Sequence, residues 1–249
     1  MPALLARAAC RHGDMLYFVH DVFIGIALEA YGEWCEGELD LLLPRLRPGD
    51  VVVDAGANVG THTLAFARAV GPTGAVWAFE PQRLVHQVLC ANLALNEQFH
   101  VHARQEALGA QPGTAHIPVL DPAAYGNYGG VATTAEGESV PLRRIDDLAL
   151  PACRLIKIDV EGHELAVLAG ARETIARHRP LLYVENERPE HTAELTAAIA
   201  ALGYTLYAHE VAFFNPANHR GETRDIFTQP DATGTRVALT AKNLFAVPS

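Results

Sequence analysis

The sequence lacks the features that mark several common classes of protein. Its four cysteines form no Cys-x-x-Cys pair, so neither a zinc site nor a disulfide framework is expected, and reduced thiols in a cytosol fit better. No run approaches the roughly 20 apolar residues of a membrane span. Met1–Cys10 is too short for a signal segment, and Arg7 interrupts it. We therefore expect a cytoplasmic protein with no membrane partner.

Positive charge is also scarce. The chain has 19 lysines and arginines against 29 aspartates and glutamates, for a net charge of −10. An acidic surface repels phosphates, so no nucleic-acid partner is expected. Apolar residues make up 49% and charged residues 19% of the 249 residues, which is typical of one globular α/β enzyme domain. No pattern indicates the oligomeric state.

Short apolar runs alternate with helical segments over most of the chain. Strands are expected at Val51–Asp54, Ala75–Phe79, Phe99–Arg104, Arg154–Asp159, Pro180–Glu185 and Tyr204–Ala208. Helices are expected at Thr61–Val70, Gln82–Asn96, His163–His178 and Glu190–Leu202. This alternation predicts a doubly wound, mostly parallel sheet with helices on both faces.

The ends of the chain are assigned to the same unit. Residues 1–45 are expected to form a cap, with a mixed apolar stretch at Met15–Leu28 and a helix at Glu33–Leu46, and residues 46–249 form the main domain. Asn243–Val247 is expected to add an edge strand.

A long connection interrupts the alternation. Thr114–Val119 and Glu138–Arg143 are expected to be short strands that flank the glycine-rich loop Asp121–Gly137. Such a loop is typical of a functional face, and we expect it to close over a bound ligand. Its tyrosines, Tyr125 and Tyr128, either stack on a ring of that ligand or are simply exposed.

The segment Asp54–Gly60 lies where the first expected strand turns into a helix. Gly56 lets the backbone approach a ligand closely, and Gly60 permits close packing at the helix start. The helix start offers free N–H groups, and ligands of open α/β sheets bind at this edge. The predicted ligand contacts here are Asp54, Gly56, Ala57, Asn58, Gly60 and Thr61.

Glu80 ends the second strand, where its carboxylate can bind both hydroxyls of a ribose. It lies twenty residues after Gly60, which also fits an NAD-dependent oxidoreductase. The turn GANVG lacks the central glycine of GxGxxG, however, and the acid before it suits a cationic methionine moiety better than a pyrophosphate. These residues favour S-adenosylmethionine over NAD. Pro81, Glu106, Ala107 and Asp159 complete the predicted contacts, with Glu106 and Ala107 beside the adenine.

Four segments together resemble the FkbM family of methyltransferases. They read VVVDAGANVGTHTLAFA, AFEP, LIKIDVEGHELAVLAGA and RPLLYVEN. The resemblance runs from about Tyr31 to Leu206. The turn Asp54–Gly60 is shared with all class I methyltransferases, whereas the block Lys157–Glu164, followed by Gly170, is more specific to FkbM-like proteins.

The resemblance implies a class I, Rossmann-like fold with S-adenosylmethionine as methyl donor and S-adenosylhomocysteine as product. It also implies O-methylation of a small-molecule acceptor such as a sugar or a natural-product intermediate, without naming that acceptor. The alternative from a different class is a donor-binding module that has lost catalysis.

An alcohol acceptor must lose its proton, and acidic residues follow the next two strands. Asp159 ends one strand, His163 lies four residues later, and Glu185 ends the following strand in the same cleft. His163 or Asp159 is the predicted general base. Glu161 and Glu164 either belong to this site or complement the dipole of the helix that follows.

A divalent cation could remove the proton instead. Asp159, Glu185 and Asn186 resemble the metal cluster of catechol-type O-methyltransferases, and such oxygen ligands suit Mg²⁺. Glutamate stands here where that group has aspartate, so a metal-free base is the preferred prediction and no metal ligand is assigned.

Overall fold

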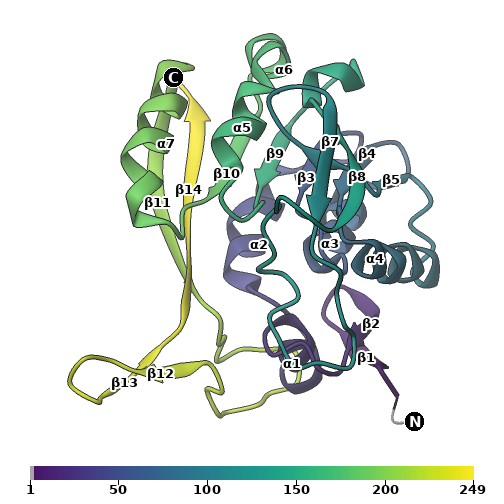
Figure 1. Cartoon of the computed structure of the whole chain (residues 1–249), viewed down its shortest axis with the longest axis vertical. Coiled ribbons are helices and arrows are strands. Elements are labelled where there is room, and N and C mark those ends of the chain that lie inside the picture. Colours follow the sequence, from purple (N-terminus) through teal and green to yellow (C-terminus); the bar gives the residue numbers. More distant parts are fainter. Residues whose placement is uncertain (1–2) are drawn as a thin grey trace.

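Four short apolar runs, which helices bury on both faces, form most of the parallel part of the central sheet, and the half-exposed segment Val101–Arg104 forms its edge. The computed structural model describes residues 3–249 and has a seven-stranded sheet in the order β11-β14-β10-β9-β3-β4-β5 (Figure 1). Strands β5, β4, β3, β9 and β10 run parallel, and β14 is antiparallel to both of its neighbours. The bounds are β3 Val51–Ala55, β4 Ala75–Phe79, β5 Val101–Arg104, β9 Leu155–Ile158, β10 Leu181–Glu185, β11 Tyr204–Ala212 and β14 Thr240–Pro248.

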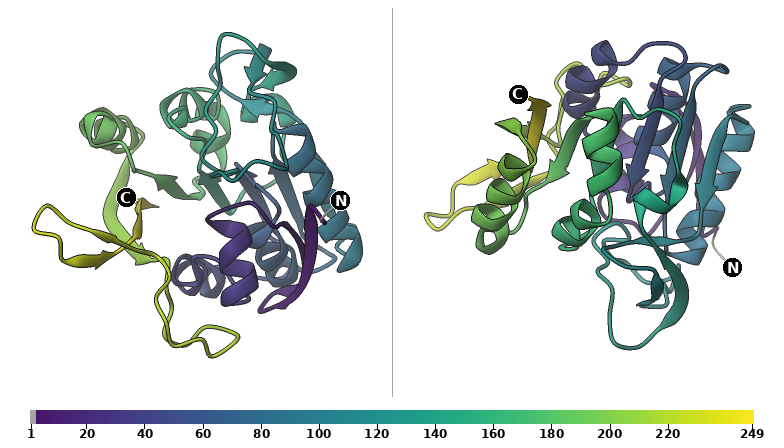
Figure 2. Two further views of the ribbon diagram at one scale, coloured as in Figure 1. Left: turned by 60° about the horizontal axis from the view of Figure 1, so that its bottom comes forward. Right: turned by 90° about the horizontal axis from the view of Figure 1, so that it is seen from above.

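Helices cover both faces of this sheet, as the alternation predicted (Figure 2). One face carries α2 (Glu36–Leu42), α3 (Thr61–Val70) and α4 (Arg83–Leu95). The other carries α5 (Glu164–Ala169), α6 (Arg172–His178) and α7 (Pro189–Ala201). The predicted doubly wound, mostly parallel α/β fold is confirmed. None of the helices within residues 3–249 is long and apolar enough to cross a membrane.

The helix predicted at His163–His178 is two helices, and the prediction of one was wrong. The chain bends at Gly170, where a Cβ atom would lie 2.1 Å from the carbonyl oxygen of Gly109. The free N–H groups at the start of the second helix have an acceptor outside the helix. The carboxylate of Asp146 accepts hydrogen bonds from the backbone N–H groups of Glu173 and Thr174. A side chain remote in sequence therefore supports the second helix.

The C-terminal strand lies inside the sheet, which corrects its assignment to an edge. β14 pairs with β10 on one side and β11 on the other, so β11 is the edge strand. Between β11 and β14 the chain leaves the sheet as an arm, residues 213–239, which carries the hairpin β12 (Thr228–Pro230) and β13 (Arg236–Ala238). No periodic pattern indicated this arm.

The first 45 residues contain a hairpin that the apolar pattern did not reveal. β1 (Leu5–Cys10) pairs with β2 (Gly13–Phe18), followed by α1 (Ile24–Ala30) and then α2. The helix expected at Glu33–Leu46 is thus limited to α2 and a short 3-10 turn at Leu43–Arg45. The cap packs on the main sheet, since apolar residues of β2 and α1 share one core cluster with α3 and α4.

A small separate sheet flanks the loop at Asp121–Gly137. β7 (Gly113–Ile117) and β8 (Glu138–Arg143) lie close to the predicted strands, and β6 (Ala107–Leu108) pairs with β8. Within the loop, Tyr128 is buried and packs edge-on against Phe18 with 5.2 Å between ring centroids, so it is a core residue rather than a ligand platform. Tyr125 is exposed, and the predicted closure of the loop stays a prediction.

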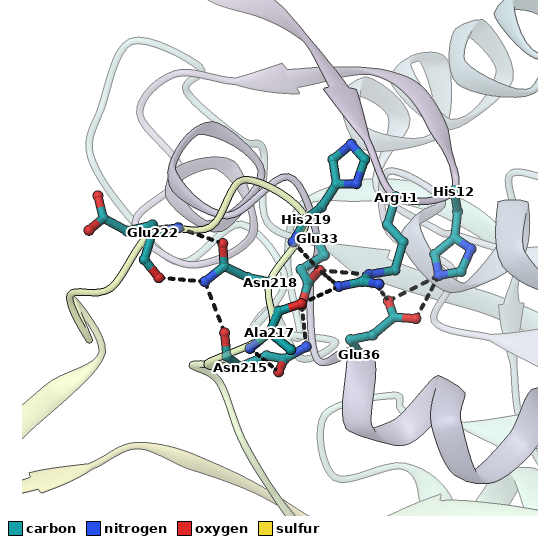
Figure 3. Close-up of polar contacts among 9 residues, drawn as sticks. All are labelled: Arg11, His12, Glu33, Glu36, Asn215, Ala217, Asn218, His219 and Glu222. Atoms are coloured by element: carbon teal, nitrogen blue, oxygen red, sulfur yellow. Dashed lines mark hydrogen bonds and ion pairs between the residues drawn. The ribbon is translucent and has the colours of Figure 1, made fainter.

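The cap and the arm are fastened together by a buried carboxylate, Glu33 (Figure 3). Glu33 accepts hydrogen bonds from the guanidinium of Arg11 at 2.7 Å, the side chain of Asn215 at 2.8 Å and the backbone N–H of His219 at 2.8 Å. Arg11 also donates to the carbonyl oxygen of Ala217. We call this group the Glu33 clasp. It joins segments that are nearly 200 residues apart in the sequence.

Replacing Glu33 by alanine is expected to lower the free energy of unfolding by about 2–3 kcal/mol, because it leaves buried donors without an acceptor. Urea denaturation measures the change. The matched control is Asp14→Ala, which removes the exposed ion pair with Arg7 and should cost less than about 1 kcal/mol. Equal losses in the two variants would show that the clasp does not hold the arm.

Candidate donor and acceptor cleft

The turn after β3 has the geometry that a closely bound ligand needs. Gly56 has φ +82°, and a Cβ atom there would lie 1.7 Å from the carbonyl oxygen of Asp159. Only glycine lets the ends of β3 and β9 approach so closely. At Gly60, φ is +94° and a Cβ atom would meet Leu89 of α4 at 2.7 Å, so this glycine permits the predicted close packing.

Two connected cavities open at this edge of the sheet. A small one of about 50 Å³ is lined by Pro81, Glu106 and Ala107. A larger cleft of about 410 Å³ reaches from the turn to the cap and the arm. Both cavities are lined by Gly56, Glu80 and Asp159, so they meet at the turn. Ala57, Asn58 and Thr61 line the larger one.

Glu80 is held by the backbone around it. Its carboxylate accepts hydrogen bonds from the N–H groups of Asn58 at 3.0 Å and Gln82 at 2.8 Å. Burial raises the pKa of Glu80 to about 7 in spite of these two donors. The residue lines both cavities. Glu106, by contrast, forms an ion pair with Arg143 at 2.6 Å.

Asp54 lies beneath the cleft and lines neither cavity. It is fully buried, accepts a hydrogen bond from the hydroxyl of Thr63 at 2.6 Å, and lies 3.5 Å from the ammonium of Lys157. Lys157 also donates to Asp159 at 3.1 Å. Burial lowers the pKa of Lys157, but the charges of Asp159 and Asp54 outweigh burial and raise it above the usual value. Asp54 and Lys157 thus support the site from below.

Three carboxylates gather where β9 and β10 end. Asp159, Glu161 and Glu185 each offer an oxygen, and these oxygens lie within 4.8 Å of one another. We call them the carboxylate cluster. Burial, together with the charge of Asp159, raises the pKa of Glu161 to about 7 and that of Glu185 to about 10. Such a cluster can accept a proton or hold a cation.

The backbone places Glu161 in this cluster. Glu161 has φ +55° and Gly162 φ +97°, so the chain turns sharply after β9. Arg188 fixes the turn, since its guanidinium donates to the carbonyl oxygen of Glu161 at 3.0 Å. A non-glycine residue in the left-handed region is strained, and such strain occurs at functional sites. The sequence left two roles open for Glu161, either as part of this site or as a carboxylate that complements the dipole of the following helix.

Of the residues predicted to be catalytic, Asp159 and Glu185 are brought together and His163 is not. His163 lines the small cavity beside Glu106 and Ala107, and its Nε2 lies 2.6 Å from the hydroxyl of Thr133. Its role as base stays a prediction. Asn186 lines neither cavity, and its side chain accepts a hydrogen bond from the hydroxyl of Thr192 at 2.9 Å.

An aromatic wall closes the larger cleft, and the sequence did not indicate it. Phe23 and Trp34 come from the cap, and Phe213 comes from the start of the arm. The ring centroids of Trp34 and Phe213 lie 4.8 Å apart, and those of Phe23 and Phe213 lie 5.9 Å apart. These half-buried side chains cannot be found by periodicity, because they meet only through tertiary contacts.

The fold and the turn define a class of protein. A strand order with β14 inserted antiparallel between β10 and β11 differs from the dinucleotide-binding order, in which the strands run parallel. It is the order of the class I, Rossmann-like methyltransferase fold. The family model described as the methyltransferase FkbM domain matches residues 54–206. The chain therefore belongs to the FkbM family.

Several known proteins are similar to this chain. It is 28% identical over 204 residues to the 31-O-demethyl-FK506 methyltransferase FkbM of Streptomyces tacrolimicus, covering 68% of this chain and 78% of that protein. It is 31% identical over 157 residues to the methyltransferase sdnD of Sordaria araneosa, covering 49% and 60%. It is 32% identical over 143 residues to the hexuronic acid methyltransferase AglP of Haloferax volcanii, covering 54% and 56%. The chain thus spans somewhat more than half of the last two proteins.

Solved structures agree with the fold. The methyltransferase FkbM of Methylobacillus flagellatus matches with a TM-score of 0.54 at 21% identity, covering 81% of this chain and 44% of that one. The precorrin-6y C5,15-methyltransferase of Geobacter metallireducens matches with a TM-score of 0.51 at 15% identity, covering 85% and 86%.

Proposed function

We propose that this protein transfers a methyl group from S-adenosylmethionine to a hydroxyl of a small molecule. The observation that carries the proposal is the carboxylate cluster, which lies where the larger cleft meets the turn after β3. We call this turn, Gly56–Gly60, the donor turn. The names of two relatives support a small-molecule acceptor, since one is a 31-O-demethyl-FK506 methyltransferase and one a hexuronic acid methyltransferase, and the first name supports transfer to oxygen.

The donor is proposed to lie along the carboxyl ends of β3 and β4. Its adenine would occupy the small cavity beside Ala107, its ribose would meet Glu80, and its methionine moiety would extend along Asn58 and Thr61 into the larger cleft. This places the sulfonium near Asp159, where a negative charge stabilises a cation. The acceptor would occupy the rest of the larger cleft.

The carboxylate cluster is proposed to take the acceptor's proton. The hydroxyl oxygen attacks the methyl carbon, the carbon–sulfur bond breaks with its electron pair going to sulfur, and the hydroxyl proton passes to Glu161. The pKa of Glu161, about 7, suits a base that works near neutral pH. Asp159, Glu161 and Glu185 could alternatively hold a divalent cation that acidifies the hydroxyl.

Removing the Glu80 side chain should weaken donor binding. Glu80→Ala loses a hydrogen-bonding charged group, which is expected to cost about 1.5–3 kcal/mol, or roughly a 10- to 150-fold higher Kd. Isothermal titration calorimetry with S-adenosylmethionine and S-adenosylhomocysteine measures it.

Two further variants make this measurement specific. Glu80→Gln keeps one acceptor oxygen for the surrounding backbone, so it should bind the donor more weakly than the wild type but fold normally by circular dichroism. Glu173→Ala removes an exposed carboxylate on α6 and should leave donor affinity unchanged. If all three variants bind as the wild type does, the ribose does not lie at Glu80.

A further inference from the structure

The walls of the larger cleft carry a strong excess of acidic over basic side chains. Six acidic side chains line it: Glu38, Glu80, Asp159, Glu161, Glu185 and Glu187. Among the described residues, the lining contains one lysine and no arginine. That lysine, Lys157, is buried and already paired with Asp54 and Asp159. An entering anion would therefore meet no free lysine or arginine side chain.

The donor compensates only the part of this charge that lies near the turn. Glu80 and Asp159 border both cavities and would face the donor's ribose and sulfonium. Glu38, Glu185 and Glu187 line only the larger cleft, on the side toward the cap and β14. Burial and the neighbouring carboxylates raise the pKa of Glu185, so this group holds a proton in the free protein. A cation that enters the cleft displaces that proton, so carboxylates of one sign in a low-dielectric cleft still select ligands of positive charge.

The same part of the cleft offers apolar and polar contacts for a ring compound. The aromatic wall of Phe23, Trp34 and Phe213 presents ring surfaces, and aromatic faces attract cations as well as apolar faces. A buried donor or acceptor also remains free. Nε2 of His62, on a residue only 6% exposed, makes no hydrogen bond, although it lies 3.2 Å from a carboxylate oxygen of Glu38.

An unpartnered buried ring nitrogen is costly unless a ligand satisfies it. His62 lines the larger cleft at the start of α3, between the donor turn and Glu38. A hydroxyl or amine on a bound acceptor would supply the missing hydrogen bond. Acidic walls, an aromatic surface and an unpartnered ring nitrogen together favour a ligand that has a positive charge, an apolar face and a polar group.

We propose that the acceptor is a positively charged hydroxyl compound, an amino alcohol or amino sugar whose apolar face lies on the aromatic wall and whose ammonium faces Glu185 and Glu187. This inference rests on the proposed methyl transfer and narrows its substrate. It separates this chain from the relative that acts on a hexuronic acid, because a carboxylate on the acceptor would be repelled here.

The charge of the cleft can be measured without an acceptor, through Trp34. The chain has two tryptophans, so Trp77→Phe leaves Trp34 as the single fluorophore, and Trp34→Phe gives the contribution of Trp77 by difference. At constant ionic strength, caesium should quench Trp34 about threefold or more better than iodide, relative to the neutral quencher acrylamide. Glu187→Gln should reduce this preference, and Glu173→Gln on α6 should not.

Matched probes then test the acceptor class in protein saturated with S-adenosylhomocysteine. Methyl glucosaminide, methyl glucoside and methyl glucuronide differ in charge on a similar ring. The glucosaminide should protect Trp34 from acrylamide best, the glucoside less and the glucuronide least. Added salt should reduce the differences among the three. Iodide quenching equal to that by caesium overturns the proposal, as does binding of the glucuronide or glucoside in preference to the glucosaminide.

The quenching result decides the proposal if none of the three sugars binds. Calorimetry with S-adenosylmethionine on the same samples keeps the two proposals apart. A protein that shows the caesium preference but binds no donor has the acidic cleft without the proposed methyl transfer. A protein that binds the donor without the caesium preference keeps the proposed function and refutes a cationic acceptor.

Discussion

Glu161→Gln is expected to lower turnover by about 10²- to 10⁴-fold, the usual contribution of a general base. Glutamine has almost the same shape as glutamate but cannot accept the acceptor's proton. Donor affinity should persist, because Glu80 and the turn after β3 are unchanged. Formation of S-adenosylhomocysteine with a hydroxyl acceptor measures turnover, and calorimetry measures donor binding.

The pH profile provides an independent check on Glu161. Its pKa in the free protein is about 7, and it must be ionised to act as base. Below pH 7, kcat/KM should therefore rise about tenfold per pH unit and then level off. Glu161→Gln should remove this limb from whatever activity remains.

The same ionisations affect stability in the opposite direction. Glu161 and Glu185 have folded-state pKa values above the usual value of 4.5, so the folded protein binds more protons than the unfolded chain. Their contribution to stability is complete below pH 4.5 and is lost as the pH rises through about 7 and then about 10.

Two treatments separate the competing mechanisms. His163→Ala should change turnover far less than Glu161→Gln, because His163 lies in the small cavity. If His163→Ala is inactive and Glu161→Gln is active, His163 is the base. EDTA should leave activity intact, whereas inactivation that Mg²⁺ reverses would show that the carboxylate cluster holds a metal ion.

Lys157→Met should destabilise the protein by about 3–5 kcal/mol, the cost of leaving a buried charge without its partner. Methionine retains most of the side-chain volume, so the loss comes mainly from charge. Asp54 would remain fully buried, with the Thr63 hydroxyl as its one close partner. Urea denaturation of the wild type and the variant gives the difference in free energy of unfolding.

A second variant and a pH comparison test this explanation. Asp54→Asn/Lys157→Met removes both charges and should recover part of the loss. In Lys157→Met alone, a buried carboxylate stands without its cationic partner, so the variant's deficit should shrink at low pH and grow as the pH rises. A deficit that is equal at pH 5 and pH 8, and unchanged in the double variant, would point to lost packing.

Local patterns gave much of the fold because the relevant signals lie close together in the sequence. The bounds of α3 and β4 match the predictions, since apolar runs and glycine breaks delimit them. The prediction of one helix at His163–His178 was wrong because the helix breaks at Gly170, where Gly109, some sixty residues away in the sequence, approaches the backbone closely. The hairpin β1–β2 was not predicted, because the apolar pattern of its two strands is irregular.

The residues of the candidate site likewise fall into those that the sequence predicted and those that only the structure placed. The glycine-rich turn after β3 and the place of Glu80 beside it could be predicted from the sequence, because glycine and acid spacing at strand ends reflects backbone requirements. The carboxylate cluster was read in part: Asp159 and Glu185 end neighbouring strands, but only the left-handed turn at Glu161 shows that its side chain joins them. The placement of His163 could not be read, because it depends on how the chain turns after β9.

The sequence by itself determined the parallel strands of the sheet, the glycine-rich turn after β3 and the family, because these depend on short-range periodicity and on glycines that the backbone geometry requires. The tertiary structure decided which side chains share the acceptor cleft. Its aromatic wall joins the cap to the arm, and the Glu33 clasp that holds them connects residues nearly 200 positions apart. No local pattern encodes such contacts, because they form only when the folded sheet brings both ends of the chain to the same edge.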